Sequence, residues 1–315
     1  MKDKILILTV FALFSVTSSA QQVPQFSQNM FNKLANNPAI SGSSDFINAG
    51  VLHRSQWMGF TGAPITLNLA VERPVEILNG GIGLNIVSDA IASYDNIGVQ
   101  FSYAYQTSLG DGQLGIGASA GMYQSALNGS ELKPSEGGDN TIPTSQISGS
   151  SPDFGAGLYY NTQDVYIGLS TLHITEPSFT KSDGDIINLS RHYFLLTGYY
   201  YEISPELSLN PSIYLKSDGS TSQIDINTNI IYNNKMWGGV SYRNGDNLLS
   251  PELVFLTGMK MKSSKNKNED DLQIGIAYDV VLSDISNNTL EFMIGYSFKI
   301  EYDRPEKSYK NPRYL

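Results

Sequence analysis

The chain has 315 residues, no cysteine and a formal net charge of −10. Only 16% of its residues are charged and only 20 are lysine or arginine, so it lacks the basic surface that binds nucleic acid. Beyond the first 20 residues, no apolar run reaches the ~18–20 residues of a transmembrane helix, which excludes a polytopic helical membrane protein. Its 19 tyrosines, 13 phenylalanines and 29 glycines instead favour strands, tight turns and aromatic belts.

Residues 1–20 are typical of a secretory signal peptide. A basic start with two lysines is followed by the apolar stretch 5–14 and by the small residues Ser18-Ser19-Ala20. We therefore expect a cleaved Sec-type signal and a mature chain that begins at Gln21. This mature chain has no cysteine for a lipid anchor or a disulfide.

Residues 21–44 precede the first expected strand. Four apolar residues recur there at near-helical spacing: Phe26, Met30, Phe31 and Leu34. The pattern stops before Asn37-Pro38, because proline cannot continue a helix from that position. A short helix and an extended plug both fit this segment, which we expect in the lumen of a barrel or on its periplasmic rim.

Between residues 45 and 300, apolar residues recur at every second position. Val99 and Phe101, for example, are separated by Gln100 and followed by Ser102. This alternation predicts strands with one face toward an apolar medium and the other toward a polar one. About fourteen segments show it, each of roughly 9–12 residues, the length that a tilted strand needs to cross a bilayer. We therefore expect an all-β fold, a transmembrane antiparallel β-barrel of about 14 strands that contacts outer-membrane lipid.

The expected strands begin near residues 45, 64, 80, 96, 113, 154, 165, 192, 207, 222, 236, 252, 272 and 289. The two longest connections, 124–153 and 175–191, fall on one rim, and most connections on the other rim are short. The connection 261–271 breaks this rule. In an outer-membrane barrel the short turns face the periplasm, so we expect both termini there. A soluble β-sandwich fits less well, because its polar face would be rich in lysine and glutamate.

Aromatic residues gather at the expected strand ends, as in the aromatic belt of a membrane barrel. They are Trp57, Phe60, Tyr94, Tyr159, Tyr160, Tyr199, Tyr200, Tyr201, Trp237 and Tyr242. Trp57 and Phe60 lie in the first connection, where Gly59, Gly62 and Pro64 favour a compact turn. Two hypotheses fit these two residues: they belong to the belt, or they fold over the lumen and contact an exported partner.

Residues 301–315 follow the last strand as a mixed-charge tail, which we expect on the periplasmic side. Basic and aromatic residues near a free carboxylate suit a peptide that docks on a partner. The candidate partner-binding residues of the tail are Arg304, Lys310, Pro312, Arg313, Tyr314 and Leu315. The alternative is a disordered remnant.

The sequence predicts neither an enzyme nor a cofactor nor a metal site. His53, His173 and His192 have no metal-binding spacing, and no G-x-S-x-G motif occurs. A hydrolase that assembles a Ser–His–acid site around His192 from distant strands is a minor alternative. The acidic run 269–271 is typical of a solvated turn rather than a calcium loop.

Several segments resemble one family in their order along the chain. They are PQFSQNMFNKLANNPAISGS at 24–43, RSQWMGFTGAPIT at 54–66, GAGLYYN at 155–161, VYIGLS at 165–170, LNPSIYLKSDG at 209–219, QIDIN at 223–227, MWGGVSYR at 236–243, IGIAYDV at 274–280 and NPRYL at 311–315. On these segments the chain resembles the PorP/SprF family of Bacteroidetes outer-membrane proteins.

The resemblance implies a component of the type IX secretion system. Members of the family are integral outer-membrane barrels. Some work with periplasmic secretion and gliding-motility components, and others are paired with large surface adhesins that carry a type B C-terminal domain. The alternative from the residues alone is an outer-membrane diffusion channel or a transporter of hydrophobic solutes, since polar residues are expected to line the lumen. They are Asn68, Gln100, Gln106, Asp225 and Asn229.

Overall fold

The computed structural model describes residues 23–132, 145–176, 178–180, 186–244, 251–262, 271–282 and 287–299. The expected signal peptide and the tail 301–315 lie outside these described residues. Within them, no helix combines the length and the apolar character needed to cross a membrane.

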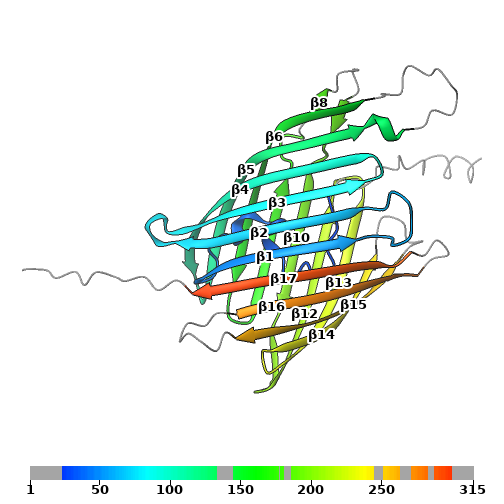
Figure 1. Ribbon diagram of the computed structural model, residues 1–315. Coiled ribbons are helices and arrows are strands. Elements are labelled where there is room, and N and C mark those ends of the chain that lie inside the picture. Colours follow the sequence, from blue (N-terminus) through cyan, green and yellow to red (C-terminus); the bar gives the residue numbers. More distant parts are fainter. Residues whose placement is uncertain are drawn as a thin grey trace, which may run out of the picture.

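Fourteen antiparallel strands form a closed barrel, as the sequence predicts (Figure 1). They are β1 (Phe46–Ser55), β2 (Ile65–Val75), β3 (Gly80–Ile91), β4 (Tyr94–Leu109), β5 (Gly112–Asn128), β6 (Gln146–Asn161), β7 (Val165–Leu172), β10 (His192–Tyr199), β12 (Leu207–Ser217), β13 (Ser222–Tyr232), β14 (Met236–Asn244), β15 (Glu252–Lys262), β16 (Asp271–Val281) and β17 (Thr289–Lys299). Each strand pairs with the next, and β1 pairs with β17 to close the ring. Three short strands supplement it: β11 (Tyr201–Ser204) extends β10 along β12, and β8 (Ser178–Thr180) pairs with β9 (Ile186–Asn188).

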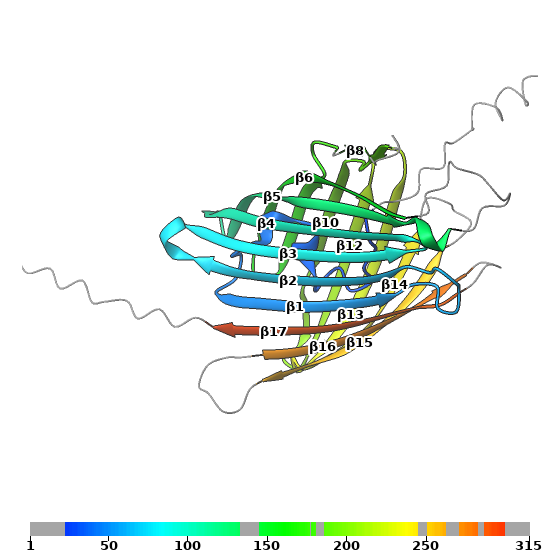
Figure 2. The ribbon, with the colours of Figure 1, turned by 45° about the horizontal axis from the view of Figure 1, so that its top comes forward.

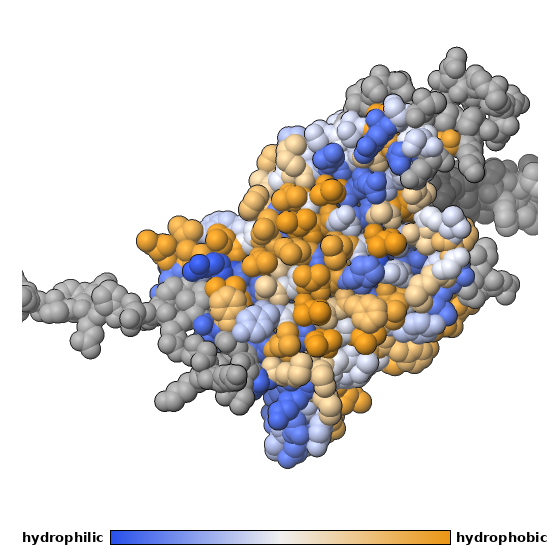
Figure 3. All heavy atoms as spheres, in the orientation of Figure 1, coloured by the Kyte–Doolittle hydropathy of each residue, from blue (hydrophilic) through white to orange (hydrophobic). Residues whose placement is uncertain are grey.

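The two faces of the barrel wall differ in polarity. Phe101 is 64% exposed on the outside, whereas its neighbour Gln100 points inward and donates a hydrogen bond to Asp153. Exposed isoleucine, leucine, valine and phenylalanine cover the outside, and most buried side chains of the wall are polar. Apolar residues accordingly gather over the middle of the outer face (Figure 3). Soluble proteins bury their apolar side chains, whereas this barrel exposes them on the outside and keeps polar ones inside. The structure therefore confirms which side chains the sequence predicts to face outward.

The connections define two rims. The long-loop rim holds connections 56–64, 92–93, 129–145, 173–191, 218–221, 245–251 and 282–288. The short-turn rim holds connections 76–79, 110–111, 162–164, 205–206, 233–235 and 263–270, together with the start of β1 and the end of β17. The long connection 263–270, which breaks the rule of short turns, joins β15 to β16 on the short-turn rim. It does not change the number of strands.

One predicted connection is much shorter than expected. β5 continues to Asn128 and β6 begins at Gln146 rather than near residue 154, so the expected loop 124–153 shrinks to 129–145. Pairs such as Gln124↔Ser150 extend the ladder beyond the apolar part of both strands. The serine- and glycine-rich sequence resembles a loop, but backbone hydrogen bonds hold it as strand, and its few apolar side chains, such as Leu127 and Ile147, are buried.

The N-terminal segment fills the interior of the barrel, where the blue trace lies inside the ring of strands in both ribbon views (Figures 1 and 2). Its first described residue, Val23, lies near the long-loop rim, where its carbonyl accepts from Lys216 Nζ (3.2 Å), one residue before the end of β12. The segment then crosses the lumen to reach Ser44 and β1 at the short-turn rim. The expectation that the N-terminal end lies on the short-turn rim is therefore wrong for this described residue, because the chain threads the barrel.

We call residues 23–44 the plug. It contains no α-helix but two 3-10 turns, η1 (Lys33–Ala35) and η2 (Pro38–Ile40). Asn37 fixes η2, since its Oδ1 accepts from the Ala39 N–H (2.9 Å) while its Nδ2 donates to the Leu158 carbonyl on β6 (3.0 Å). The sequence left open a short helix and an extended plug. The segment does fill the lumen as a plug, but its conformation is irregular rather than extended.

The hydrophobic core lies between the plug and the wall. Leu34, Ala39 and Ile40 pack against the barrel residues Ala70, Tyr159, Tyr166, Leu172, Phe194, Leu196 and Tyr214. Met30 packs against Val254, Leu256 and Ala277, and Phe26 packs with Leu52. The plug is thus part of the folded core rather than a loose insert.

Candidate functional site

A buried ionic cluster holds the start of the plug. Arg54 on β1 pairs with Asp279 (2.8 Å) and Glu291 (3.2 Å), and Arg243 on β14 pairs with Asp225 (2.9 Å), Asp279 (3.0 Å) and Glu252 (2.8 Å). We call these six side chains the ionic cluster. Five of them are almost completely buried, and Glu252 is slightly exposed. Buried charges persist only when they are paired and hydrogen-bonded, so each member fixes its neighbours.

The plug completes the hydrogen bonding of this cluster. The backbone N–H groups of Ser27 and Gln28 donate to the two carboxylate oxygens of Glu291, each at 2.8 Å. The Ser27 hydroxyl donates to Asp279 (2.7 Å) and accepts from Arg54 (2.8 Å). Four carboxylates face two guanidinium groups, and the plug N–H groups offset part of the surplus negative charge. The arrangement binds a specific backbone segment, and we infer that it acts as a latch.

The wall is also shaped to the plug at the other end. A Cβ atom at Gly117 on β5 would lie 2.5 Å from the Cα atom of Ala39, and one at Gly157 on β6 would collide with Asn37. Only glycine lets the plug backbone approach the strands this closely. Two of the alternating glycines of β5, Gly115 and Gly117, are therefore required where the plug residue Ala39 packs on the strand.

Of the five polar residues that the sequence predicts as the lining of a channel, three are hydrogen-bonded to the plug, whereas Gln100 donates to Asp153 on β6 and the Asn229 amide has no hydrogen-bond partner in the described residues. Asn68 accepts from Asn32 (2.7 Å), Gln106 donates to the carbonyls of Ala39 and Ser41 (3.1 and 2.9 Å), and Asp225 accepts from Asn29 (3.2 Å). These side chains form a socket for the plug rather than the wall of an open pore.

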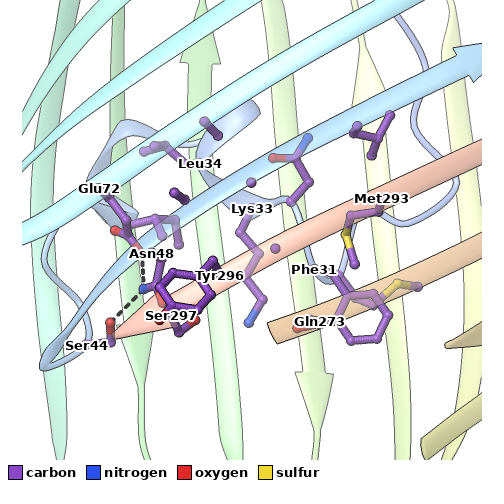
Figure 4. A pocket seen from close by; sticks show the side chains of 18 of the residues that line it. Phe31, Lys33, Leu34, Ser44, Asn48, Glu72, Gln273, Met293, Tyr296 and Ser297 are labelled. Atoms are coloured by element: carbon purple, nitrogen blue, oxygen red, sulfur yellow. Dashed lines mark hydrogen bonds between the residues drawn. The ribbon is translucent and has the colours of Figure 1, made fainter. Parts of the chain in front are cut away.

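A cavity of about 380 Å³ remains between the plug and the wall of β1, β2, β16 and β17 (Figure 4). It lies in the half of the lumen toward the short-turn rim, where Ser44, Asn161 and Ser297 line it. In this view Lys33 lies between the bonded group of Ser44, Asn48 and Glu72 on one side and Phe31 and Met293 on the other (Figure 4). Its side chain extends from the plug to β6 and β7.

Lys33 is the cationic group of this cavity. Its Nζ atom lies 3.6 Å from the ring centroid of Tyr166 and donates to the Tyr159 hydroxyl (3.3 Å). Burial lowers the pKa of the Lys33 ammonium to about 8, and the nearby Glu72 carboxylate opposes part of this shift. Near neutral pH the cavity therefore contains a partly desolvated positive charge.

Within the described residues, the three histidines show no Ser–His–acid arrangement of the kind that the minor alternative requires. His53 points outward, whereas His173 and His192 are buried with their rings 6.0 Å apart. His173 Nδ1 lies 3.0 Å from Asp153, but His192 Nε2 has no hydrogen-bond partner in the described part of the chain, so His192 activates no serine there. Within the same residues, no three His, Cys, Asp or Glu side chains are placed to hold a metal ion.

The loop that holds Trp57 and Phe60 is a fixed turn on the long-loop rim. Trp57 and Met58 donate backbone hydrogen bonds to Thr289 and Asn288 at the start of β17 (3.1 and 2.8 Å). Gly59 and Gly62 have φ angles of 89° and 77°, and Trp57 itself has a φ angle of 49°. Trp57 is 40% exposed and Phe60 is 61% exposed, so the turn presents both rings outward.

Two residues predicted for the aromatic belt face the lumen instead. Trp237 is 7% exposed and packs on Phe31 of the plug (4.9 Å between ring centroids), and Tyr159 lines the cavity. Trp237 has the same inward phase on β14 as Ser241 and Arg243. The alternation of residues along β14 therefore predicts that Trp237 points inward. The belt was predicted instead because aromatic residues at strand ends are typical of it.

The other predicted partner-binding residues, Arg304, Lys310, Pro312, Arg313, Tyr314 and Leu315, lie outside the described residues. The last described strand, β17, ends at the short-turn rim, whereas Trp57 and Phe60 lie on the long-loop rim. Sequence reasoning did not single out Arg54, Arg243, Asp279 and Glu291. Each of these residues places a charge at an inward position of a barrel strand. Burial of such a charge costs free energy, so it could have marked them as candidate functional residues.

The family profile described as "Type IX secretion system membrane protein PorP/SprF" matches residues 18–298. No curated protein sequence matches the chain significantly.

Among solved structures, the CymD monoaromatic hydrocarbon channel is 12% identical, with a TM-score of 0.52, over 92% of this chain and 97% of its own. A FadL homologue from Pseudomonas aeruginosa is 12% identical, with a TM-score of 0.48, over 90% of this chain and 96% of its own. The toluene transporter TbuX from Ralstonia pickettii is 13% identical, with a TM-score of 0.48, over 91% of this chain and 97% of its own. At such low identity the likeness to CymD shows a shared barrel fold alone.

Proposed function

Because the chain belongs to the PorP/SprF family of type IX secretion system membrane proteins, we propose that it is a non-enzymatic outer-membrane barrel that supports export or surface anchoring of a partner protein. The partner would be a large surface adhesin with a type B C-terminal domain, in the context of gliding motility. The short-turn rim would face the periplasmic secretion components, as in other outer-membrane barrels.

The plugged lumen is the observation that favours this role over diffusion. A diffusion channel needs a continuous polar path, but here the lumen contains a latched plug that belongs to the hydrophobic core. A barrel of this kind can serve as a rigid platform whose two rims bind partners. On the long-loop rim, the exposed rings of Trp57 and Phe60 are the candidate contact, since aromatic residues on a rigid turn make strong interface anchors.

The alternative is a diffusion channel or a transporter of hydrophobic solutes. The cavity inside the lumen favours this alternative, because a solute could occupy it. Conductance of the purified barrel in a planar bilayer discriminates the two functions: a platform should be closed, and a diffusion channel should conduct.

The proposed function is tested by surface display of the partner in cells that lack their own copy and express a variant. Trp57→Ala with Phe60→Ala, and deletion of residues 310–315, should each reduce display of the partner. Both variants should still fold, which is seen when the unheated and the heated barrel migrate differently on a gel. Arg313→Glu with Tyr314→Ala is the full-length counterpart of the deletion. Normal display in all three variants contradicts the assigned surfaces, and normal display in cells that lack the chain altogether contradicts the function itself.

A further inference from the structure

Two glycines in the barrel wall contribute to the cavity, because they place no side chain in the lumen. Gly50 on β1 and Gly295 on β17 are paired across the seam that closes the barrel, and both face the lumen. A Cβ atom would meet nothing closer than 3.8 Å at Gly50 and 3.7 Å at Gly295. This contrasts with Gly117, where the plug occupies the space beside the glycine. A larger side chain would therefore fit at either seam glycine without a clash. The two glycines are needed only to keep the volume beside them open.

The Lys33 ammonium at this cavity has spare donor capacity. An ammonium group has three N–H donors, and in the described residues Lys33 donates only to the Tyr159 hydroxyl, with no carboxylate within ion-pair distance. Glu72 is already engaged by the Gly42 N–H (3.1 Å) and by Asn48 Nδ2 (2.9 Å). A partly desolvated cation without a bonded anion favours a carboxylate that enters the cavity.

The rest of the lining matches a peptide better than a lipid. Side-chain amides of Asn32, Asn48, Asn68, Asn161 and Gln273 reach the cavity, beside the apolar groups of Phe31 and Met293. The amides of Asn32, Asn48 and Asn68 are already hydrogen-bonded to neighbouring side chains, but Asn161 Oδ1 is buried without a partner in the described residues. A peptide N–H can donate to this oxygen, whereas an acyl chain cannot. The apolar groups can accept one hydrophobic side chain.

We propose that this cavity binds an extended peptide segment of a periplasmic partner protein, with a carboxylate on Lys33 and an adjacent apolar side chain between Phe31 and Met293. The inference rests on the proposed function, because that function places the short-turn rim in the periplasm. The segment enters from this rim, where Ser44, Asn161 and Ser297 border the cavity. Binding would tie the plug and the β1–β17 seam to the partner.

The test is calorimetric titration of the purified full-length barrel in detergent with two peptides, acetyl-Leu-Asp-Ser-amide and its asparagine analogue, and with decanoate. The aspartate peptide should bind about 10-fold or more tightly than the asparagine peptide, and Lys33→Met should remove this preference. Gly50→Leu fills the cavity without changing a charge and should abolish binding. Gly238→Leu is the matched control, because Gly238 is equally open but faces outward on β14.

Equal binding of the two peptides, or binding that survives Gly50→Leu, overturns the proposal. So does decanoate binding that depends on Lys33 and Gly50 while the peptides do not bind, because the cavity would then be an amphiphile site. Tighter peptide binding after deletion of residues 310–315 would identify the chain's own tail as the occupant and overturn the partner assignment.

The proposed function is judged separately by surface display. Display that depends on the chain but is normal with Gly50→Leu overturns only the inference about the cavity. Loss of display with Gly50→Leu, together with loss of peptide binding and with normal display for Gly238→Leu, supports it.

Discussion

At the scale of single residues, the latch is asymmetric in charge. Arg243 contacts three carboxylates, so Arg243→Met leaves Arg54 alone against four buried or half-buried acids. We expect a loss of about 3–5 kcal/mol in the free energy of unfolding, as for one member removed from a buried ion pair. Glu252→Gln lowers the surplus negative charge at the partly exposed edge of the cluster and should cost about 1 kcal/mol or less. Denaturant unfolding in detergent measures both, and equal losses would mean that the surplus charge does not govern the latch.

Lys33 gives the plug a pH dependence of predictable sign. Its pKa of about 8 is lower than the ordinary value of about 10.4 that it regains on unfolding, so the charged ammonium weakens the fold. This cost is fully present below about pH 8 and disappears as the pH rises through the unfolded value. We therefore expect Lys33→Met to raise the unfolding temperature at pH 7 and the gain to shrink by pH 10.5. Lys235→Met, in an exposed turn, is the control for loss of a lysine, and a constant gain across this range would contradict the prediction.

At the scale of elements, the alternation of residues predicts thirteen of the fourteen strand starts to within two residues, because lipid on one side and polar groups on the other impose a period of two. It fails for β6, because the first half of this strand has no apolar residues at alternate positions beyond Ile147, and it does not locate the plug. The plug path depends on contacts between residues far apart in the sequence, such as Ser27 with Glu291 and Asn37 with Leu158. Glu291 and the glycines of β5 are unusual residues for a barrel strand and could have indicated a contact inside the lumen. Neither shows from the sequence which residue of the plug it contacts.

The two rims permit a matched test of orientation. Connection 129–145 belongs to the long-loop rim and connection 263–270 to the short-turn rim, and each is long enough for an inserted protease site. We expect cleavage of intact cells at a site inserted after residue 139 and no cleavage at one inserted after residue 266. After lysis both sites should be cut. The reverse result would place the short-turn rim outside and would overturn the periplasmic assignment of the cavity.

At the scale of the whole molecule, the path of the chain constrains how the barrel closes. The plug enters near the long-loop rim and continues into β1 at the short-turn rim, and β1 then pairs with the last strand, β17. In the folded barrel the seam therefore encloses the segment that leads into β1. Gln28 and Ser27 bind Glu291 on β17 itself, so the plug contacts the strand that completes the ring. The plug also packs against the wall in three separate hydrophobic clusters, so polar and apolar contacts both hold it in the lumen.

The same arrangement predicts the electrical behaviour of the barrel with and without the plug. The intact barrel should show little conductance in a planar bilayer, since residues 23–44 occupy the lumen. Deletion of residues 24–43 should open a pore lined by four carboxylates and two arginines, and this surplus of negative charge should make it selective for potassium over chloride. The reversal potential in a potassium chloride gradient measures the selectivity. If the deletion variant does not fold, Gly117→Leu provides a second test, because its side chain takes the place of Ala39 and displaces the plug. Equal conductance of the intact and unplugged barrels would show that the plug does not seal the lumen, and would favour the channel over the platform.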